Sequence, residues 1–301
     1  MSGSKTVSLR STRQRSIRIA APIFLLPALL FLLVYVAYPI IDSFVTSFMR
    51  WRGMGGGRSF TGFENWITLA TDVSFWQAFF NNIKIMFLSL LFQVPFAMSL
   101  ATFLDVTDKK GIVFKVVWFI PYLLSSVVIG VLFKYALDAN SGLLASVSKL
   151  LGGGAVDLLG NPKVALYTVI GVVCWQYTPF YMILYLAAYG TIPIELFEAA
   201  AIDGATRGQY FWRVSMPLLR PTVISGMILS IIGSLKYFDL VYVMTGGGPG
   251  GASEIMATYM FKNSFVRFNM GYGATVASGM FILITLVALI VINALNRQTE
   301  L

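Results

Sequence analysis

Long apolar stretches are the feature that most constrains the fold of this 301-residue chain. A helix needs about 20 residues to cross the roughly 30 Å hydrocarbon core of a bilayer. Six stretches are long enough, and short polar segments separate them: 20–41, 82–104, 117–137, 165–187, 222–243 and 272–294. The sequence therefore predicts an all-α membrane protein with six transmembrane helices. Pro179 makes the fourth helix the least regular, which neighbouring helices can accommodate.

Composition excludes a soluble domain of ordinary type. Hydrophobic residues make up 57% of the chain and charged residues only 12%, against about 25% charged in a typical soluble domain. The basic segment 1–19 precedes the first apolar stretch, as it would in a signal peptide. However, this stretch is too long for a signal core, and no small-x-small cleavage site follows it. We therefore expect a retained helix.

Lys and Arg are more frequent in the segments on the side of the N-terminal tail. These segments are the tail 1–19, the connection after the second helix, the loop 188–220 and the C-terminal segment 295–301. Basic loops favour the cytoplasmic face. Both termini are therefore predicted to be cytoplasmic. The net charge of +9 reflects this topology, and no nucleic-acid-binding motif accompanies it.

Several kinds of chemistry are excluded by residue type. The chain has no His and one Cys, Cys174, so a histidine base, a disulfide within the chain and a cysteine zinc cluster are all excluded. The glycine-rich segment 245–251 lacks the Gly-Lys-Ser/Thr ending of a phosphate loop. It is predicted to be a flexible turn on the outer side. We expect no catalytic residue, no metal and no cofactor in this chain.

The loop 188–220 carries the most specific pattern. Pro193 suits the start of a short helix, and Gly204 falls where that helix would end in a left-handed residue. A second short helix is expected to stop before Pro217. Glu198 lies beside a run of small alanines, which would let the helix enter a groove of another protein and pair with a basic residue there. From the residues alone, an interfacial amphipathic helix remains the alternative.

The same loop resembles the EAA loop of ATP-binding-cassette importer permeases. Glu198-Ala199-Ala200 is followed by three residues, Gly204, nine residues and then Val214-Ser215-Met216-Pro217. Val and Met replace the family's Ile and Leu. The resemblance implies a type I importer permease architecture, with a coupling helix that docks on a separate ATPase. The ATPase-docking residues would be Glu198, Ala199, Ala200, Asp203, Gly204 and Pro217.

The resemblance extends to the branch that imports carbohydrates, through 60–66 and 238–249. It implies a second permease subunit, two ATPase subunits that bind ATP and Mg, an extracytoplasmic substrate-binding protein, and a bacterial or archaeal inner membrane. The predicted cargo is a sugar or oligosaccharide. Glycerol-3-phosphate or a related polyol within the same family is the alternative. An ion-coupled secondary transporter is less favoured, because Asp239 is a poor basis for one.

Aromatic and polar residues within the apolar stretches are the predicted substrate pathway, because sugars need ring faces and hydrogen-bonding groups. They are Trp175, Gln176, Tyr177, Tyr237, Asp239 and Tyr242, with Tyr181 as a further candidate. Lys236 and Asp239 are three residues apart and would share one helix face, either as an ion pair or in the pathway. Lys84 and Lys134 are expected to extend toward the membrane surface.

Overall fold

The computed structural model describes residues 24–54, 57–106, 111–154 and 156–297. The tail 1–19, the first residues of the first predicted span and the last residues of the C-terminal segment lie outside them. The helices are η1 Leu33–Ala37, α2 Tyr38–Thr46, α3 Glu64–Thr71, α4 Val73–Val106, α5 Gly111–Leu123, α6 Ser126–Ala136, α7 Leu143–Leu150, α8 Ala165–Tyr189, α9 Ile194–Ile202, α10 Arg207–Tyr210, η2 Phe211–Ser215, α11 Met216–Leu235, α12 Asp239–Met244, α13 Met256–Phe261, η3 Lys262–Val266 and α14 Met270–Arg297. Two short strands, β1 Met49–Arg50 and β2 Ser59–Phe60, pair antiparallel.

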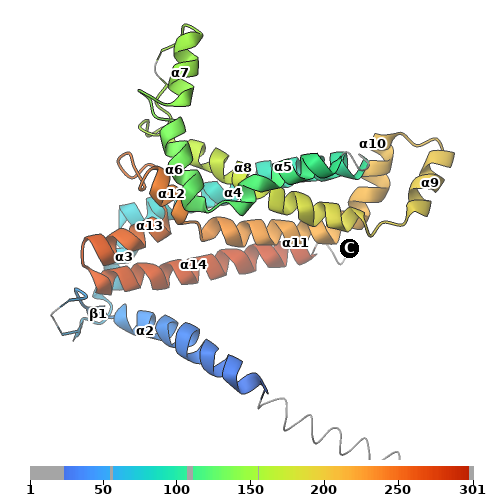
Figure 1. Ribbon diagram of the computed structural model, residues 1–301. Coiled ribbons are helices and arrows are strands. Elements are labelled where there is room, and N and C mark those ends of the chain that lie inside the picture. The colour runs from blue at the N-terminus through green and yellow to red at the C-terminus, as the bar shows by residue number, and fades with distance from the viewer. Residues whose placement is uncertain (1–23, 55–56, 107–110, 155, 298–301) are drawn as a thin grey trace, which may run out of the picture.

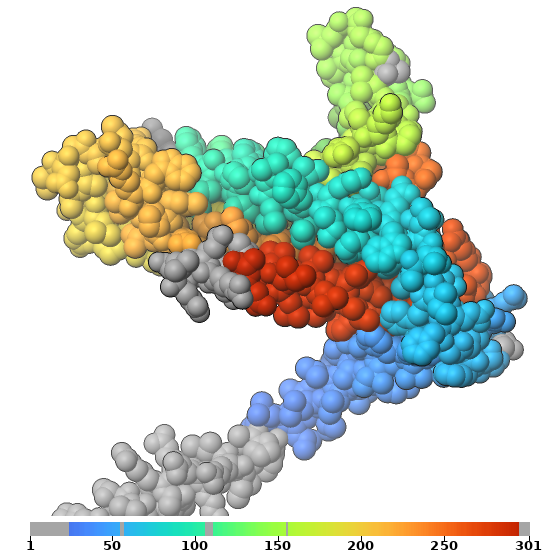
Figure 2. All heavy atoms as spheres, turned by 180° about the vertical axis from the view of Figure 1, so that it is seen from behind, coloured from blue at the N-terminus to red at the C-terminus, as the bar shows by residue number. Residues whose placement is uncertain are grey.

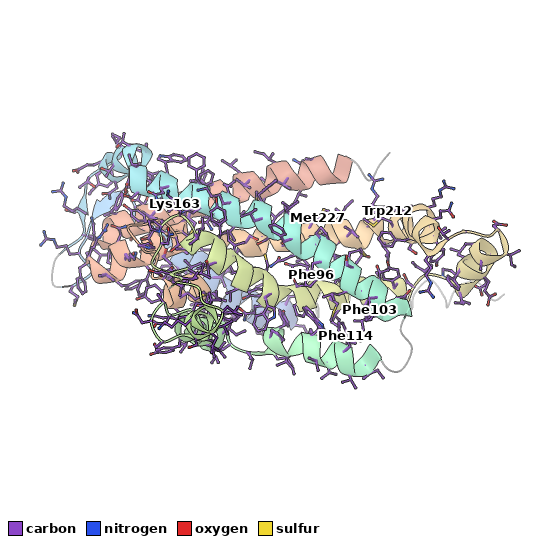
Figure 3. The ribbon with its side chains drawn as sticks, turned by 90° about the horizontal axis from the view of Figure 1, so that it is seen from above. Phe96, Phe103, Phe114, Lys163, Trp212 and Met227 are labelled. Carbon is purple, nitrogen blue, oxygen red and sulfur yellow. The ribbon has the colours of Figure 1, made fainter. Side chains whose placement is uncertain are left out.

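Within the described residues, five helices are long and apolar enough to cross a membrane, or six if the bent pair α5 and α6 forms one span. The predicted all-α membrane fold is therefore confirmed. Four of the long helices, α4, α8, α11 and α14, lie side by side, and α5 lies along α8 (Figure 1). Aromatic contacts join α4 to α5: the ring of Phe103 lies 5.4 Å from that of Phe114 (Figure 3).

The first membrane helix, Phe24–Thr46, stands apart from this bundle. It leaves the bundle as a separate arm, and the side chains in its first part are exposed (Figures 1 and 2). The C-terminal end of this helix is the part that is anchored to the bundle. The Phe44 ring meets that of Phe281 edge-on at 5.9 Å, and Thr275 Oγ1 donates to the carbonyl of Ser47 at 2.9 Å.

The third predicted span, 117–137, is not one straight helix. It breaks between α5 and α6, whose axes differ by 93°. Ser125 has an extended backbone, and its hydroxyl accepts a hydrogen bond from the N–H of Val127, which starts the new helix. A hydropathy pattern cannot show this break, because a serine that caps a helix can lie within an otherwise apolar segment.

The fifth predicted span, 222–243, also differs. The helix ends at Leu235, and α12 begins at Asp239 after a non-helical Phe238 with φ −141° and ψ −62°. Lys236 and Asp239 therefore do not share a helix face, and both are exposed. Among the described residues they form no ion pair with each other.

Asp72 ties together the end of the bundle opposite α9. Its carboxylate accepts hydrogen bonds from the hydroxyls of Tyr259 and Tyr272 and from the N–H of Ser74, at the start of α4. Burial raises the pKa of this carboxyl, but the hydroxyl and N–H donors outweigh burial and leave the pKa of Asp72 below its ordinary value. One side chain thereby joins α4, α13 and α14.

Candidate functional site

The first candidate region is the loop that carries α9. Pro193 precedes the helix as its N-cap, with an extended backbone, and Glu195 lies in the first turn. The negative charge of Glu195 suits a helix N-terminus. No residue of α9 is buried. Glu198 and Ala199 are exposed, and Ala200 is half-buried.

Gly204 ends α9 in the way that the sequence predicts. Its φ is +73°, in the left-handed region that favours glycine. The N–H of Ala205 donates to the carbonyl of Ala200 at 2.9 Å, and the N–H of Gly204 donates to that of Ala201 at 3.1 Å. This pair of bonds is the Schellman motif, which satisfies the last carbonyls of a helix.

The sequence predicts that the helix after Gly204 stops before Pro217, but this helix continues past the proline. Thr206 opens it with a capping box to Gln209, and it runs from Arg207 to Leu235 without interruption. A π turn, η2, precedes the proline, and the N–H of Met216 donates to the carbonyl of Phe211, five residues back. This wider turn relieves the clash that a proline ring makes in a regular α-helix. Pro217 is thus an exposed residue near the start of α11.

The loop that carries α9 forms a knob at one end of the molecule (Figure 2, yellow and orange). One aromatic contact holds its two halves together: the rings of Phe197 and Tyr210 meet edge-on at 5.2 Å. Several large apolar side chains are exposed on this loop. Exposed fractions are 63% for Ile194, 86% for Ile202 and 67% for Trp212. Asp203 is exposed beside them. This loop can present a helix, with one carboxylate at its centre, to a complementary groove.

The second candidate region surrounds the two helix breaks, where buried amides replace missing helical hydrogen bonds. Gln176 Nε2 donates to the carbonyl of Leu124 at the α5–α6 break, at 3.3 Å. Asn82 Nδ2 approaches the carbonyl of Leu235 at 3.4 Å, at the end of α11. Its Oδ1 accepts from the N–H of Met256 at 2.9 Å. Broken helices are stable inside a membrane protein only when such groups satisfy the freed backbone.

Aromatic rings gather between these breaks. The Tyr177 ring lies 5.3 Å from the Tyr237 ring and 6.1 Å from the Tyr122 ring, and its hydroxyl is 3.0 Å from the Ser126 hydroxyl. Gln176 Nε2 also donates to that hydroxyl, at 3.3 Å. Of the predicted pathway residues, the structure thus brings Gln176, Tyr177 and Tyr237 together. We call these three residues, with Tyr122 and Ser126, the break cluster.

The other predicted pathway residues have different neighbours. Trp175 is on α8 but meets Phe133 of α6, edge-on at 5.3 Å. Tyr242 stacks on Phe238 at 5.2 Å and contacts Phe261. Asp239 is exposed at the start of α12. In the described part of the chain, none of these three side chains forms a hydrogen bond or ring contact with the break cluster, although Phe238 is next to Tyr237 in sequence.

Sequence reasoning missed a buried amide that links three helices. Gln93 of α4 is 0% exposed; its Oε1 accepts from the Ser230 hydroxyl at 3.2 Å, and its Nε2 donates to the carbonyl of Val173 at 3.4 Å. Amides within an apolar stretch, such as Asn82 and Gln93, were the available signal, because polar groups are costly in a membrane unless they have partners.

Comparisons with known proteins agree with these features. Residues 93–300 match the family described as binding-protein-dependent transport system inner membrane component. A probable ABC transporter permease of Pyrococcus horikoshii is 33% identical over 90% of this chain and 92% of its own. The arabinooligosaccharides transport system permease protein AraP of Bacillus subtilis is 31% identical over 90% of this chain and 87% of its own.

Solved structures show the same fold. A chain of a bacterial ABC transporter involved in the import of the acidic polysaccharide alginate superposes with a TM-score of 0.80, at 24% identity, over 97% of this chain and 98% of that chain. The exposed α9 loop, the broken membrane helices and the family match lead to one conclusion. The chain is a multi-pass inner-membrane component of the binding-protein-dependent transport family, an ABC transporter permease.

Proposed function

We propose that this chain forms half of the translocation pathway of an ATP-driven importer for a sugar or oligosaccharide. The observation that carries the proposal is the α9 loop, a helix closed by a Schellman motif and with no buried residue, at one end of a membrane bundle. A helix that is ended by its own turn and has no fully buried residue is suited to bury its surface in a partner.

That partner is a separate ATPase, which would bind ATP and Mg. Glu198 would pair with a basic residue of the ATPase, and Ala199 and Ala200 would allow close approach. Gly204 fixes the turn, Asp203 lies beside it, and Pro217 follows in the helix that would carry the motion into the bundle. Because Arg207–Leu235 is one continuous helix, movement of the loop reaches Gln93 and the break cluster through a rigid element.

The break cluster is the proposed substrate pathway. The helix breaks bring the Gln176 amide and the Ser126 hydroxyl together as hydrogen-bonding groups, and the tyrosine rings supply faces for sugars. Trp175, Asp239 and Tyr242 remain predicted pathway residues at greater separation. The carbohydrate cargo is supported by the name of the arabinooligosaccharide relative. Glycerol-3-phosphate or a related polyol is the alternative cargo.

The family's description as binding-protein-dependent supports a substrate-binding protein as one partner. We propose a second permease, two ATPase subunits and an extracytoplasmic substrate-binding protein. The exposed helix Phe24–Thr46 would pack against the second permease and lipid. Both termini and the α9 loop would lie in the cytoplasm, which places the α13 end on the outer side.

Co-purification tests the docking. The full chain should retain its ATPase subunit, and a Glu198→Arg, Gly204→Val double variant should lose it while remaining folded. A matched control is Glu64→Arg, Gly208→Val, which changes one exposed carboxylate at the other end and one glycine in the same loop.

Uptake by the chain in vesicles without ATP would refute the proposal in favour of a secondary transporter. Tyr237→Ala should weaken uptake while ATP hydrolysis continues.

A further inference from the structure

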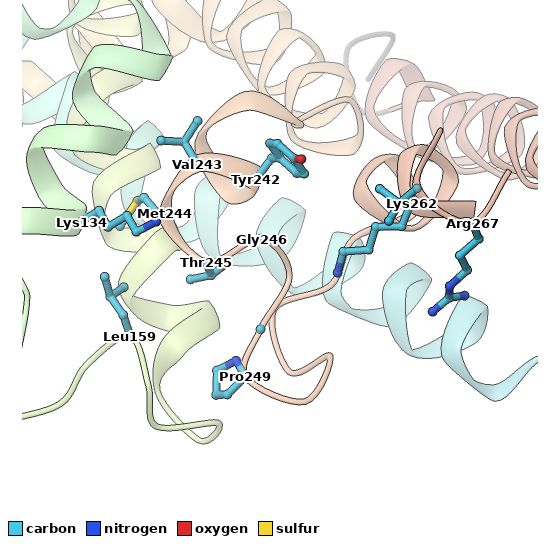
Figure 4. Close-up of a pocket in the computed structure, with 12 residues that line it drawn as sticks. Lys134, Leu159, Tyr242, Val243, Met244, Thr245, Gly246, Pro249, Lys262 and Arg267 are labelled. Carbon is cyan, nitrogen blue, oxygen red and sulfur yellow. The ribbon is translucent and has the colours of Figure 1, made fainter. Parts of the chain in front are cut away.

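An open pocket of about 850 Å³ lies at the α13 end of the molecule, outside the break cluster. It is formed by α6, α12, the glycine-rich loop that follows α12, and the segment after α13 (Figure 4). Its size is within the range of small-molecule sites. The lining residues are Lys134, Leu159, Tyr242, Val243, Met244, Thr245, Gly246, Gly248, Pro249, Lys262, Val266 and Arg267.

All the charged side chains that line this pocket are positive. Three of the lining residues are cations, and none is a carboxylate. Lys134 comes from α6 on one side, whereas Lys262 and Arg267 come from the other side (Figure 4). In a concave site with apolar walls, cations of this kind raise the local concentration of anions.

One of the three cations is already neutralised. Lys262 pairs with the carboxylate of Glu254, whose side chain is only 10% exposed. A Cβ atom at Gly247 would lie 2.7 Å from that carboxylate, so the glycine lets the loop close over the pair. In the described part of the chain, Lys134 and Arg267 have no ion pair. Arg267 donates only to Asn263 Oδ1, at 3.1 Å. Two positive charges are therefore left for a ligand.

The glycine-rich loop is not the flexible turn expected from its sequence. The hydroxyls of Thr245 and Ser253 are 2.7 Å apart, and Ser253 Oγ donates to the carbonyl of Gly248 at 2.5 Å. These bonds fix the loop as one wall of the pocket. Because Gly246 and Gly248 have no side chains, a ligand can approach their peptide groups closely.

We propose that this pocket binds the anionic group of a charged carbohydrate, a carboxylate or a phosphate, before the ligand enters the break cluster. Lys134 and Arg267 would attract the anion from opposite sides of the pocket (Figure 4), and Tyr242 would contact the ring. Tyr242 stacks on Phe238, the neighbour of Tyr237, so α12 connects the pocket to the cluster. The inference rests on the proposed function and adds the class of substrate that the outer end selects.

Binding to the full chain, purified with its subunits in neutral phosphatidylcholine nanodiscs, tests the inference. The probes are trigalacturonate, neutral galactotriose and glycerol-3-phosphate, at about 50 mM and about 300 mM salt. We expect at least one anionic probe to bind about tenfold more tightly than galactotriose at low salt, with less advantage at high salt. The two anionic probes distinguish carboxylate from phosphate.

The double variant Lys134→Gln, Arg267→Gln should remove this advantage. The control variant Lys149→Gln, Lys163→Gln changes two cations outside the pocket and should keep it. Equal binding of charged and neutral probes, or a preference that survives in the first variant, would overturn the inference. So would loss of substrate-binding-protein association alone in that variant, because the cations would then serve a protein carboxylate. ATP-driven uptake that favours neutral sugars would overturn the inference and leave the proposed function intact.

Discussion

In the α9 loop, the hydrogen bonds that close the turns join residues close in sequence, whereas the bonds at the opposite end of the bundle include pairs 152 to 228 positions apart. Gly204 and Thr206 close their turns with partners a few residues away. Asn82 and Asp72 instead hold α11, α13 and α14 against α4. The α9 loop is thus ordered locally and exposed, and the opposite end is stabilised by its own chain.

Replacing Asn82 should give the largest loss of stability. Leucine has a similar volume but would leave the carbonyls of Ser234 and Leu235 and the N–H of Met256 without their side-chain partner. Each buried group left unsatisfied costs about 1–3 kcal/mol. We therefore expect Asn82→Leu to lower the free energy of unfolding by about 3 kcal/mol or more, measured by equilibrium unfolding in mixed detergent micelles.

The control for this change is Asn140→Leu, at an exposed turn. It should alter the unfolding free energy by less than about 0.5 kcal/mol. If both variants unfold alike, Asn82 does not hold the helix break, and the contrast between the two ends fails.

This contrast also explains what the sequence could predict. The turn at Gly204 was predictable because its glycine, its helix and its bonding partners occur within a few residues. The breaks near Ser125 and Phe238 were not, because the amides that stabilise them, Gln176 and Asn82, come from other helices. Hydropathy finds apolar stretches, and it therefore merged two broken segments into straight spans.

The candidate sites show the same division between local features, which the sequence could predict, and contacts between distant residues, which it could not. The spacing from Glu198 to Pro217 singled out the α9 loop, but it did not show that the helix continues through Pro217 across a π turn. Residue type selected Tyr177 and Tyr237 as predicted pathway residues, and only packing shows that they meet. Lys236 and Asp239 were paired on an assumed helix that ends at Leu235.

Close packing gives the next largest effect. A Cβ atom at Gly130 of α6 would lie 3.0 Å from the side chain of Val243 on α12, whereas one at Gly208 of α10 would meet nothing within 4 Å. Gly130→Leu should therefore cost about 2 kcal/mol through overpacking. Gly208→Leu should leave the unfolding free energy unchanged within about 0.5 kcal/mol. The same micelle titration measures both, and a larger loss for Gly208→Leu would reverse the comparison.

Acidification should weaken the Asp72 junction. The pKa of this carboxyl is lowered in the folded protein, so its stabilising contribution is present above the unfolded value of about 4 and is lost as the pH falls through the folded value. Between about pH 6 and about pH 3, the wild type should lose more stability than Asp72→Asn. The exposed pair Arg50–Glu64 supplies the control, Glu64→Gln, whose profile should follow the wild type. Parallel profiles for wild type and Asp72→Asn would show that the junction is not electrostatic.

The smallest expected change in global stability is at Gly204. With φ +73° and nothing within 4 Å of a Cβ atom there, Gly204→Ala meets only the backbone penalty of about 1–2 kcal/mol for a left-handed alanine. Because α9 buries no residue, this penalty should raise local opening of the loop about fivefold or more without lowering the global unfolding free energy. Amide hydrogen exchange of the segment 194–205 measures the local effect, and Gly208→Ala, at a glycine with ordinary φ, is the control. A global loss in Gly204→Ala would mean that the loop folds as one unit with the bundle, whereas a purely local loss would mean that α9 opens independently of the bundle.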